Sequence, residues 1–105
     1  MPNFNRYDPI QASLMRIEEN LVKLHSREPK DSTASLWEVA GHIWGGAYWV
    51  GELTKNPEIL KQVFELREEL SCVVLKKHSV STNAIGFESS IRKINGCFEK
   101  IKGLV

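Results

Sequence analysis

Glu38 and His42 are the two side chains whose spacing most directly suggests chemistry. Residues four apart lie one turn apart on a helix, so a carboxylate and an imidazole at this spacing can supply two ligands to a metal ion. A metal site in a protein usually needs three or four ligands. The other histidines, His25 and His78, stand at the predicted ends of other helices, where the helix dipole favours them. We therefore interpret Glu38 and His42 as a solvated pair and expect no metal and no cofactor.

The two cysteines, Cys72 and Cys97, form no recognisable catalytic motif with a histidine. If the helices that carry them are antiparallel, the two residues are offset by about nine residues, or about 13 Å of helix. A disulfide cannot span that distance. We expect both to be free thiols in a reducing compartment.

The stretch GHIWGGAYWVG, residues 41–51, combines four glycines with three large aromatic residues. It does not fit a phosphate-binding loop, because no strand precedes it and no Lys-Ser/Thr pair follows it. It does not fit a membrane span either: Glu38 and Glu52 leave only residues 39–51 free of acidic side chains, His42 lies among them, and no positive flank follows. We interpret the stretch as the middle of a helix.

Apolar periodicity and capping signals predict four helices. Asp8 and Asn56 each precede a proline and can cap a helix, Ser35 begins a capping box, and Gly103 is a plausible C-terminal stop. The predicted helices cover residues 9–25, 36–54, 57–77 and 84–102, approximately.

Each predicted helix has one apolar face, and no segment alternates long enough to indicate a strand. A connection of only two or three residues before residue 57 forces antiparallel neighbours. The sequence thus predicts an all-α, up-down-up-down antiparallel four-helix bundle, a single domain over residues 1–105 with residues 1–7 as an N-terminal extension. The expected core residues outside the second helix are Ile10, Leu14, Ile17, Leu21, Leu24, Ile59, Val63, Leu66, Leu70, Val73, Val74, Phe87, Ile91, Ile94, Phe98 and Ile101.

Composition limits the classes of function. A chain of 105 residues with 42% hydrophobic and 26% charged residues has the make-up of one globular domain. The net charge of +1 argues against nucleic-acid binding, since no strong positive field is available. The N-terminal residues lack the apolar run of a signal peptide, so we expect a cytoplasmic protein without membrane association.

The second helix has two distinct faces on a helical wheel. The expected core face contains Leu36, Val39, Ile43, Ala47 and Val50, and we place Trp37, Trp44 and Tyr48 along its edge, with Trp44 and Tyr48 toward the core. The opposite face contains Glu38, Gly41, His42, Gly45, Trp49 and Glu52. Glycines inside a helix cost about 1 kcal/mol each relative to alanine. We therefore interpret this face as a surface for another protein chain, or, equally plausibly, as a face that the bundle itself buries.

Three hypotheses of function follow. The first is a non-enzymatic protein that acts by binding another protein, as immunity proteins, antitoxins and small inhibitors do. The second is a homodimer that pairs through the second helix across a two-fold axis. The third is a bundle that binds a metal or small ligand through Glu38 and His42. A histidine on the second helix resembles DinB-type bundles, but their further histidines are missing here, so that metal site is not expected.

Overall fold

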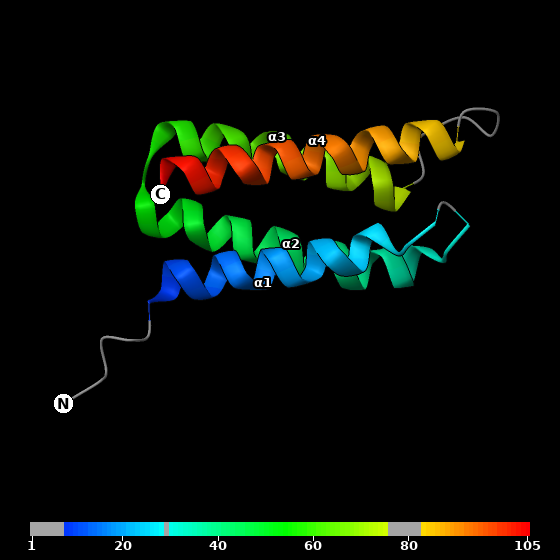
Figure 1. Cartoon of the computed structure of the whole chain (residues 1–105), viewed down its shortest axis with the longest axis horizontal. Coiled ribbons are helices and arrows are strands. Elements are labelled where there is room, and N and C mark those ends of the chain that lie inside the picture. Colours follow the sequence, from blue (N-terminus) through cyan, green and yellow to red (C-terminus); the bar gives the residue numbers. More distant parts are fainter. Residues whose placement is uncertain (1–7, 29, 76–82) are drawn as a thin grey trace.

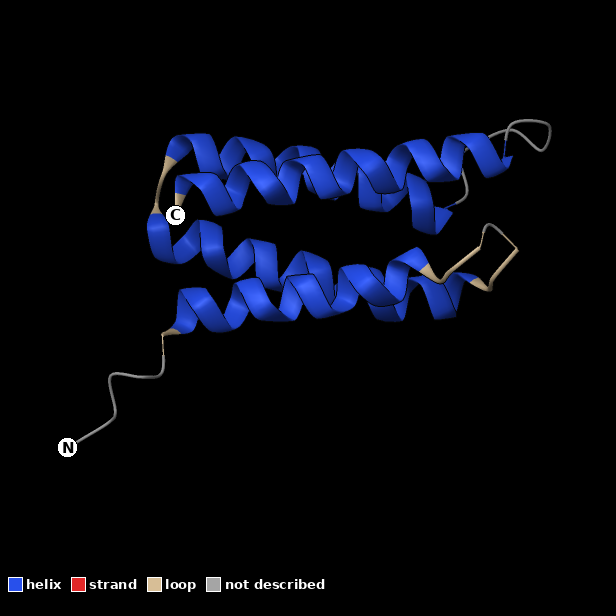
Figure 2. Ribbon diagram, viewed as in Figure 1, coloured by secondary structure: helices blue, strands red, loops and turns tan. Residues whose placement is uncertain are grey.

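Four antiparallel α-helices form the bundle that the sequence predicts, and the described part of the chain contains no strand (Figures 1 and 2). The structure is a computed structural model that describes residues 8–28, 30–75 and 83–105. The fold class is confirmed. The helices are α1 (Pro9–His25), α2 (Thr33–Thr54), α3 (Pro57–Leu75) and α4 (Asn83–Leu104).

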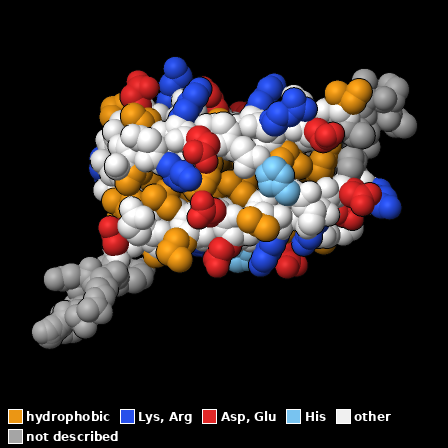
Figure 3. Space-filling model, in the orientation of Figure 1, with side chains coloured by type: hydrophobic (Ala, Val, Ile, Leu, Met, Phe, Trp, Pro, Cys, Tyr) orange, Lys and Arg blue, Asp and Glu red, His pale blue; other side chains and the backbone are white. Residues whose placement is uncertain are grey.

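The bundle consists of two tight helical hairpins. α1 packs mainly against α2 and α3 mainly against α4, while α2 and α3 join the hairpins. α1 and α4 share the smallest contact, and Figure 3 shows apolar side chains along the seam between them. Polar contacts also cross this seam: Lys102 Nζ lies 3.7 Å from Glu18 Oε2, and Asn95 Nδ2 lies 2.8 Å from His25 Nε2. α2, by contrast, has an extensive neighbour on each side.

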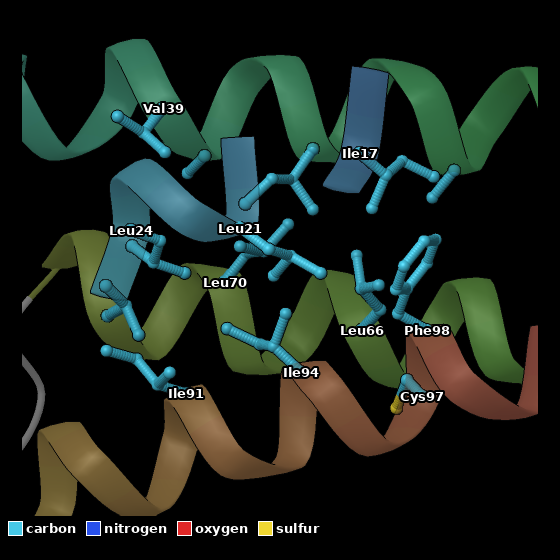
Figure 4. Packing of buried hydrophobic residues seen from close by; sticks show 14 of the residues in the cluster. Ile17, Leu21, Leu24, Val39, Leu66, Leu70, Ile91, Ile94, Cys97 and Phe98 are labelled. Atoms are coloured by element: carbon cyan, nitrogen blue, oxygen red, sulfur yellow. The ribbon is translucent and has the colours of Figure 1, made fainter. Parts of the chain in front are cut away.

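The core lies between the apolar stripes of all four helices (Figure 4). Every residue expected there outside α2 is buried, except Ile10, which is half-buried against the cluster. Removing one such aliphatic or aromatic side chain from water stabilises a fold by about 1.5–3 kcal/mol. The 4,3 spacing of apolar residues therefore located the core correctly.

The start of α2 differs from the prediction. Ser32, not Ser35, is the capping residue: its side chain accepts a hydrogen bond of 3.1 Å from the backbone N–H of Ser35. Both serines have the residue type that caps helices. Ser32 has the extended backbone that a cap requires, whereas Ser35 already lies inside the first turn. α2 therefore begins at Thr33, three residues earlier than expected.

The connection between α2 and α3 is as short as predicted. Lys55 has a left-handed backbone with φ of 53°, which ends α2. Asn56 then caps α3, because its Oδ1 accepts a hydrogen bond of 2.9 Å from the N–H of Glu58. Only Lys55 and Asn56 separate the two helices, so α2 and α3 must run antiparallel.

The other predicted helix boundaries agree with the structure only in part. Asp8 caps α1 as expected, since its Oδ1 accepts from the N–H of Ile10 at 2.9 Å. Gly103 does not stop α4, because no described glycine has a positive φ and the helix continues to Leu104. The predicted end of the third helix at residue 77 and the N-terminal extension lie outside the described residues.

Candidate functional site

The core face of α2 is as the sequence predicts. All five of its expected members are buried almost completely, and each has 1% exposure or less. The opposite face is consequently directed away from the core. The buried residues are Leu36, Val39, Ile43, Ala47 and Val50.

The six residues predicted to form an interaction surface all lie on this outward side. Glu38, His42 and Trp49 are exposed, and Gly41, Gly45 and Glu52 are partly exposed. The bundle therefore does not bury this face, although α1 covers part of it. The alternative of a completely buried second helix is wrong.

Two aromatic residues of α2 are more exposed than expected. Tyr48, expected toward the core, is 46% exposed, and Trp37 is 51% exposed, similar to Trp49 at 52%. Only Trp44 is packed against the core, and it is half-buried. We call the following eight residues the outer α2 face: Trp37, Glu38, Gly41, His42, Gly45, Tyr48, Trp49 and Glu52.

The spacing of residues contained the signal for Tyr48. Gly41, Gly45, Tyr48 and Glu52 are separated by four, three and four residues, which is the spacing of one helical stripe. Trp37 stands one turn before the first of these glycines. The prediction instead placed Tyr48 along the edge of the core face. The spacing was the better guide.

Two of the α2 glycines are explained by packing inside the bundle. A Cβ at Gly46 would lie 2.6 Å from Ile17 Cγ1 and 3.0 Å from the carbonyl oxygen of Ser13, so only glycine allows α1 to come this close. A Cβ at Gly51 would lie 3.0 Å from Leu60 Cδ2 of α3. The absence of side chains at these two positions lets α1 and α3 approach α2 from both sides.

Gly41 has no such explanation. Nothing lies within 4 Å of the position that its Cβ would occupy. Alanine would therefore fit, and would favour the helix by about 1 kcal/mol relative to glycine. Within the described part of the bundle, no packing contact requires glycine at position 41.

Gly45 supports the side chain of Arg16 from α1. Its Cβ position lies 3.4 Å from Arg16 Nη2, and the same nitrogen is 3.0 Å from His42 Nδ1. A guanidinium can only donate, so Nη2 of Arg16 donates and Nδ1 of His42 accepts. Arg16 forms no ion pair with any residue that the structure describes. Sequence reasoning missed Arg16, because the crossing of α1 and α2 that brings it to Gly45 is a tertiary feature.

A groove runs beside Trp49 where α1 crosses α2. It has a volume of about 380 Å³ and is open to solvent. The residues that line it come from both helices: Pro9, Ala12, Ser13, Arg16, Trp49 and Leu53. The groove combines an apolar wall with a single charged group, Arg16.

The described residues add nothing to the possible metal ligands or to the cysteines considered from the sequence. In the described part of the chain, no three His, Cys, Asp or Glu side chains lie close enough together to hold a metal ion, and Glu38 and His42 are joined by no third ligand. Cys72 and Cys97 are both free thiols. Burial raises the pKa of the Cys97 thiol, and the Glu65 carboxylate raises that pKa further. The higher pKa keeps this thiol protonated and makes it a poor nucleophile.

The chain matches no protein-family model, no curated protein and no solved structure. No helix in the described ranges contains a stretch both long and apolar enough to cross a bilayer.

Proposed function

We propose that this chain is a small, non-enzymatic cytoplasmic protein that acts by binding another protein through the outer α2 face. The observation that carries the proposal is the exposure of Trp37, Tyr48 and Trp49 around the open backbone at Gly41. Exposed tryptophan and tyrosine are the most frequent anchors of protein interfaces, since they bury a large apolar area and keep a polar atom for hydrogen bonding.

The glycines support a helix or strand as the partner element. A backbone can come close to a helix only where side chains are small, and Gly41 is open to solvent on this face. The flanking aromatic rings would then contact the two sides of the approaching element. Trp44 and Tyr48 are 5.9 Å apart, and Tyr48 and Trp49 are 6.1 Å apart, between ring centres. These contacts restrict the rings before binding and reduce the entropy lost on association.

A homodimer through the same face is the second candidate. An antiparallel pairing centred on Gly45 seats each Trp49 over Gly41 of the second copy, because both positions are four residues from the centre. The same register places Glu38 opposite Glu52 of the second copy, since both are seven residues away. Like charges across an interface are unfavourable. This repulsion is our reason for preferring a different protein as the partner.

A photo-crosslinking experiment tests the proposal. Benzoylphenylalanine replaces Trp49 in one variant and Ile85 in a matched control, because Ile85 is 73% exposed and lies on α4, which packs against α3 and α1. Both proteins are irradiated in the native host, and the adducts are identified by mass spectrometry. We expect a specific adduct with another protein from position 49 and none from position 85.

Binding by the purified pair then measures the contribution of each ring. We expect Trp49→Ala and Trp37→Ala each to weaken binding by at least about tenfold, as truncation of an interface anchor does. Equal adducts from positions 49 and 85, or binding that neither substitution changes, would contradict the proposal. An adduct with a second copy, together with a dimer in sedimentation, would replace it with the homodimer.

A further inference from the structure

The groove beside Trp49 has a charge that the bundle does not neutralise. Arg16 is exposed at its wall, and its guanidinium forms no ion pair in the described part of the chain; its Nη2 lies 3.0 Å from His42 Nδ1. That hydrogen bond and the bare backbone at Gly45 hold the guanidinium against α2. A guanidinium fixed in this way loses little entropy when it binds a carboxylate through two parallel hydrogen bonds.

An arginine also borders the outer α2 face on the side of α3. Arg67 of α3 lies over the ring of Trp44, with its Cζ 5.6 Å from the ring centre. It also forms no ion pair with a residue in the described ranges. The outer α2 face is therefore bordered by Arg16 on the α1 side and by Arg67 on the α3 side, and neither forms an ion pair with a described residue.

The acidic residues of the face do not cancel these charges near the groove. Glu52 Oε1 is 3.5 Å from Lys55 Nζ, and this exposed ion pair offsets part of its charge. Glu38 lies at the other end of the face, about 16 Å along the helix from Trp49. Arg16 is thus the one charged side chain among the residues that line the groove.

We propose that the groove receives an acidic segment of the partner protein, in which one apolar side chain contacts Trp49 and Leu53 and a neighbouring Asp or Glu binds Arg16. This inference rests on the proposed function and specifies the chemistry of the partner. Charge complementarity selects a carboxylate-bearing segment over a basic one, because a lysine or arginine there would face an unpaired like charge. The groove is open rather than enclosed, which suits a protruding side chain of a large partner better than a small molecule.

Peptide selection tests the inference with a defined probe. A phage library of random 16-residue peptides is selected on the full chain, with the Trp49→Ala variant as the counter-selection. We expect the enriched peptides to contain Asp or Glu next to Leu, Phe or Trp. Fluorescence polarisation with a labelled, enriched peptide then gives the dissociation constant for each variant.

The variants of Arg16 decide between a charge contact and a structural effect. We expect Arg16→Gln to weaken binding about tenfold, as expected for loss of a charge-assisted hydrogen bond. Arg16→Lys should recover part of this loss, because the charge stays while the two-pronged geometry is lost. Arg92→Gln is the matched control: it removes an exposed arginine of α4, which lines a different surface, and should leave binding unchanged. Circular dichroism establishes that each variant keeps its helical content.

The outcomes separate this inference from the proposed function. Peptides that depend on Trp49 but show no acidic enrichment, or that bind Arg16→Gln as tightly as the wild type, would overturn the acidic partner and leave the interaction surface standing. Failure to enrich any peptide over the Trp49→Ala variant would also overturn the inference, while the crosslinking at position 49 would still judge the proposed function. A dimer that Trp49→Ala dissociates would show that a second copy covers the groove.

Discussion

α2 and α4 are both 22 residues long, and each has a complete buried face, yet their outward faces differ in kind. The exposed side of α4 is covered by charge: Glu88, Arg92, Lys93, Glu99, Lys100 and Lys102 are all exposed. The exposed side of α2 has only two carboxylates, with aromatic rings and bare backbone between them. Exposed apolar residues of α4 lie near its ends, at Ile85 and Leu104.

The contrast indicates which surface is adapted to water. A helix of a small bundle normally presents charged and polar side chains to solvent, as α4 does. α2 departs from this pattern although it packs against α1 on one side and α3 on the other. Scattered exposed apolar residues are normal, but α2 exposes three aromatic rings on one side, and two of them, Tyr48 and Trp49, are in contact with each other. Exposed apolar surface of this kind often marks an interaction site.

Replacing a central glycine of each helix by alanine should change the free energy of unfolding in opposite directions. Gly46→Ala should lower the free energy of unfolding by about 2 kcal/mol, because the new Cβ overlaps Ile17 and the Ser13 carbonyl. Gly96→Ala should raise it by about 1 kcal/mol, since nothing lies within 4 Å of that Cβ position. Urea denaturation followed by circular dichroism measures both. Equal effects of the two substitutions would mean that α1 does not approach α2 as closely as described.

Most of the fold could be predicted from the sequence, because apolar spacing and capping residues are local signals. The core stripes and the caps at Asp8 and Asn56 were all located correctly. Ser32 and Ser35 have the same residue type three positions apart, so composition could not choose between them. The choice depends on where the chain leaves its extended conformation.

The proposed interaction surface could be predicted only in part from the sequence. Gly41, Gly45 and Trp49 follow from the helical wheel, and Tyr48 was available from its spacing with the glycines. Arg16 was not, since no local pattern tells which side chain of α1 crosses Gly45. A site assembled from two helices needs the packing geometry, and that geometry is set here by the close approach at Gly46.

An intermediate effect is expected at the start of α2. Ser32→Ala should lower the free energy of unfolding by about 1 kcal/mol, because it removes the acceptor for the Ser35 N–H. Ser35→Ala is the matched control, and it should change that free energy little, since its side chain caps nothing in this structure. Thermal and urea denaturation of the two variants distinguish them. The opposite ranking would restore Ser35 as the cap and move the beginning of α2 toward Trp37.

The smallest effect on the fold is the most informative about the partner. Gly41→Ala should raise the free energy of unfolding by about 1 kcal/mol. The methyl group meets no other atom in the folded state, and alanine reduces the backbone freedom of the unfolded chain. If a partner approaches the backbone at Gly41, the same methyl group must weaken binding to the protein captured at position 49. Gly96→Ala should give the same gain in stability without any loss of binding, since it lies on α4. A gain in stability together with a loss of binding at Gly41, but not at Gly96, would identify Gly41 as a glycine retained for contact with another chain. Unchanged binding would leave Gly41 unexplained and weaken the contrast between α2 and α4.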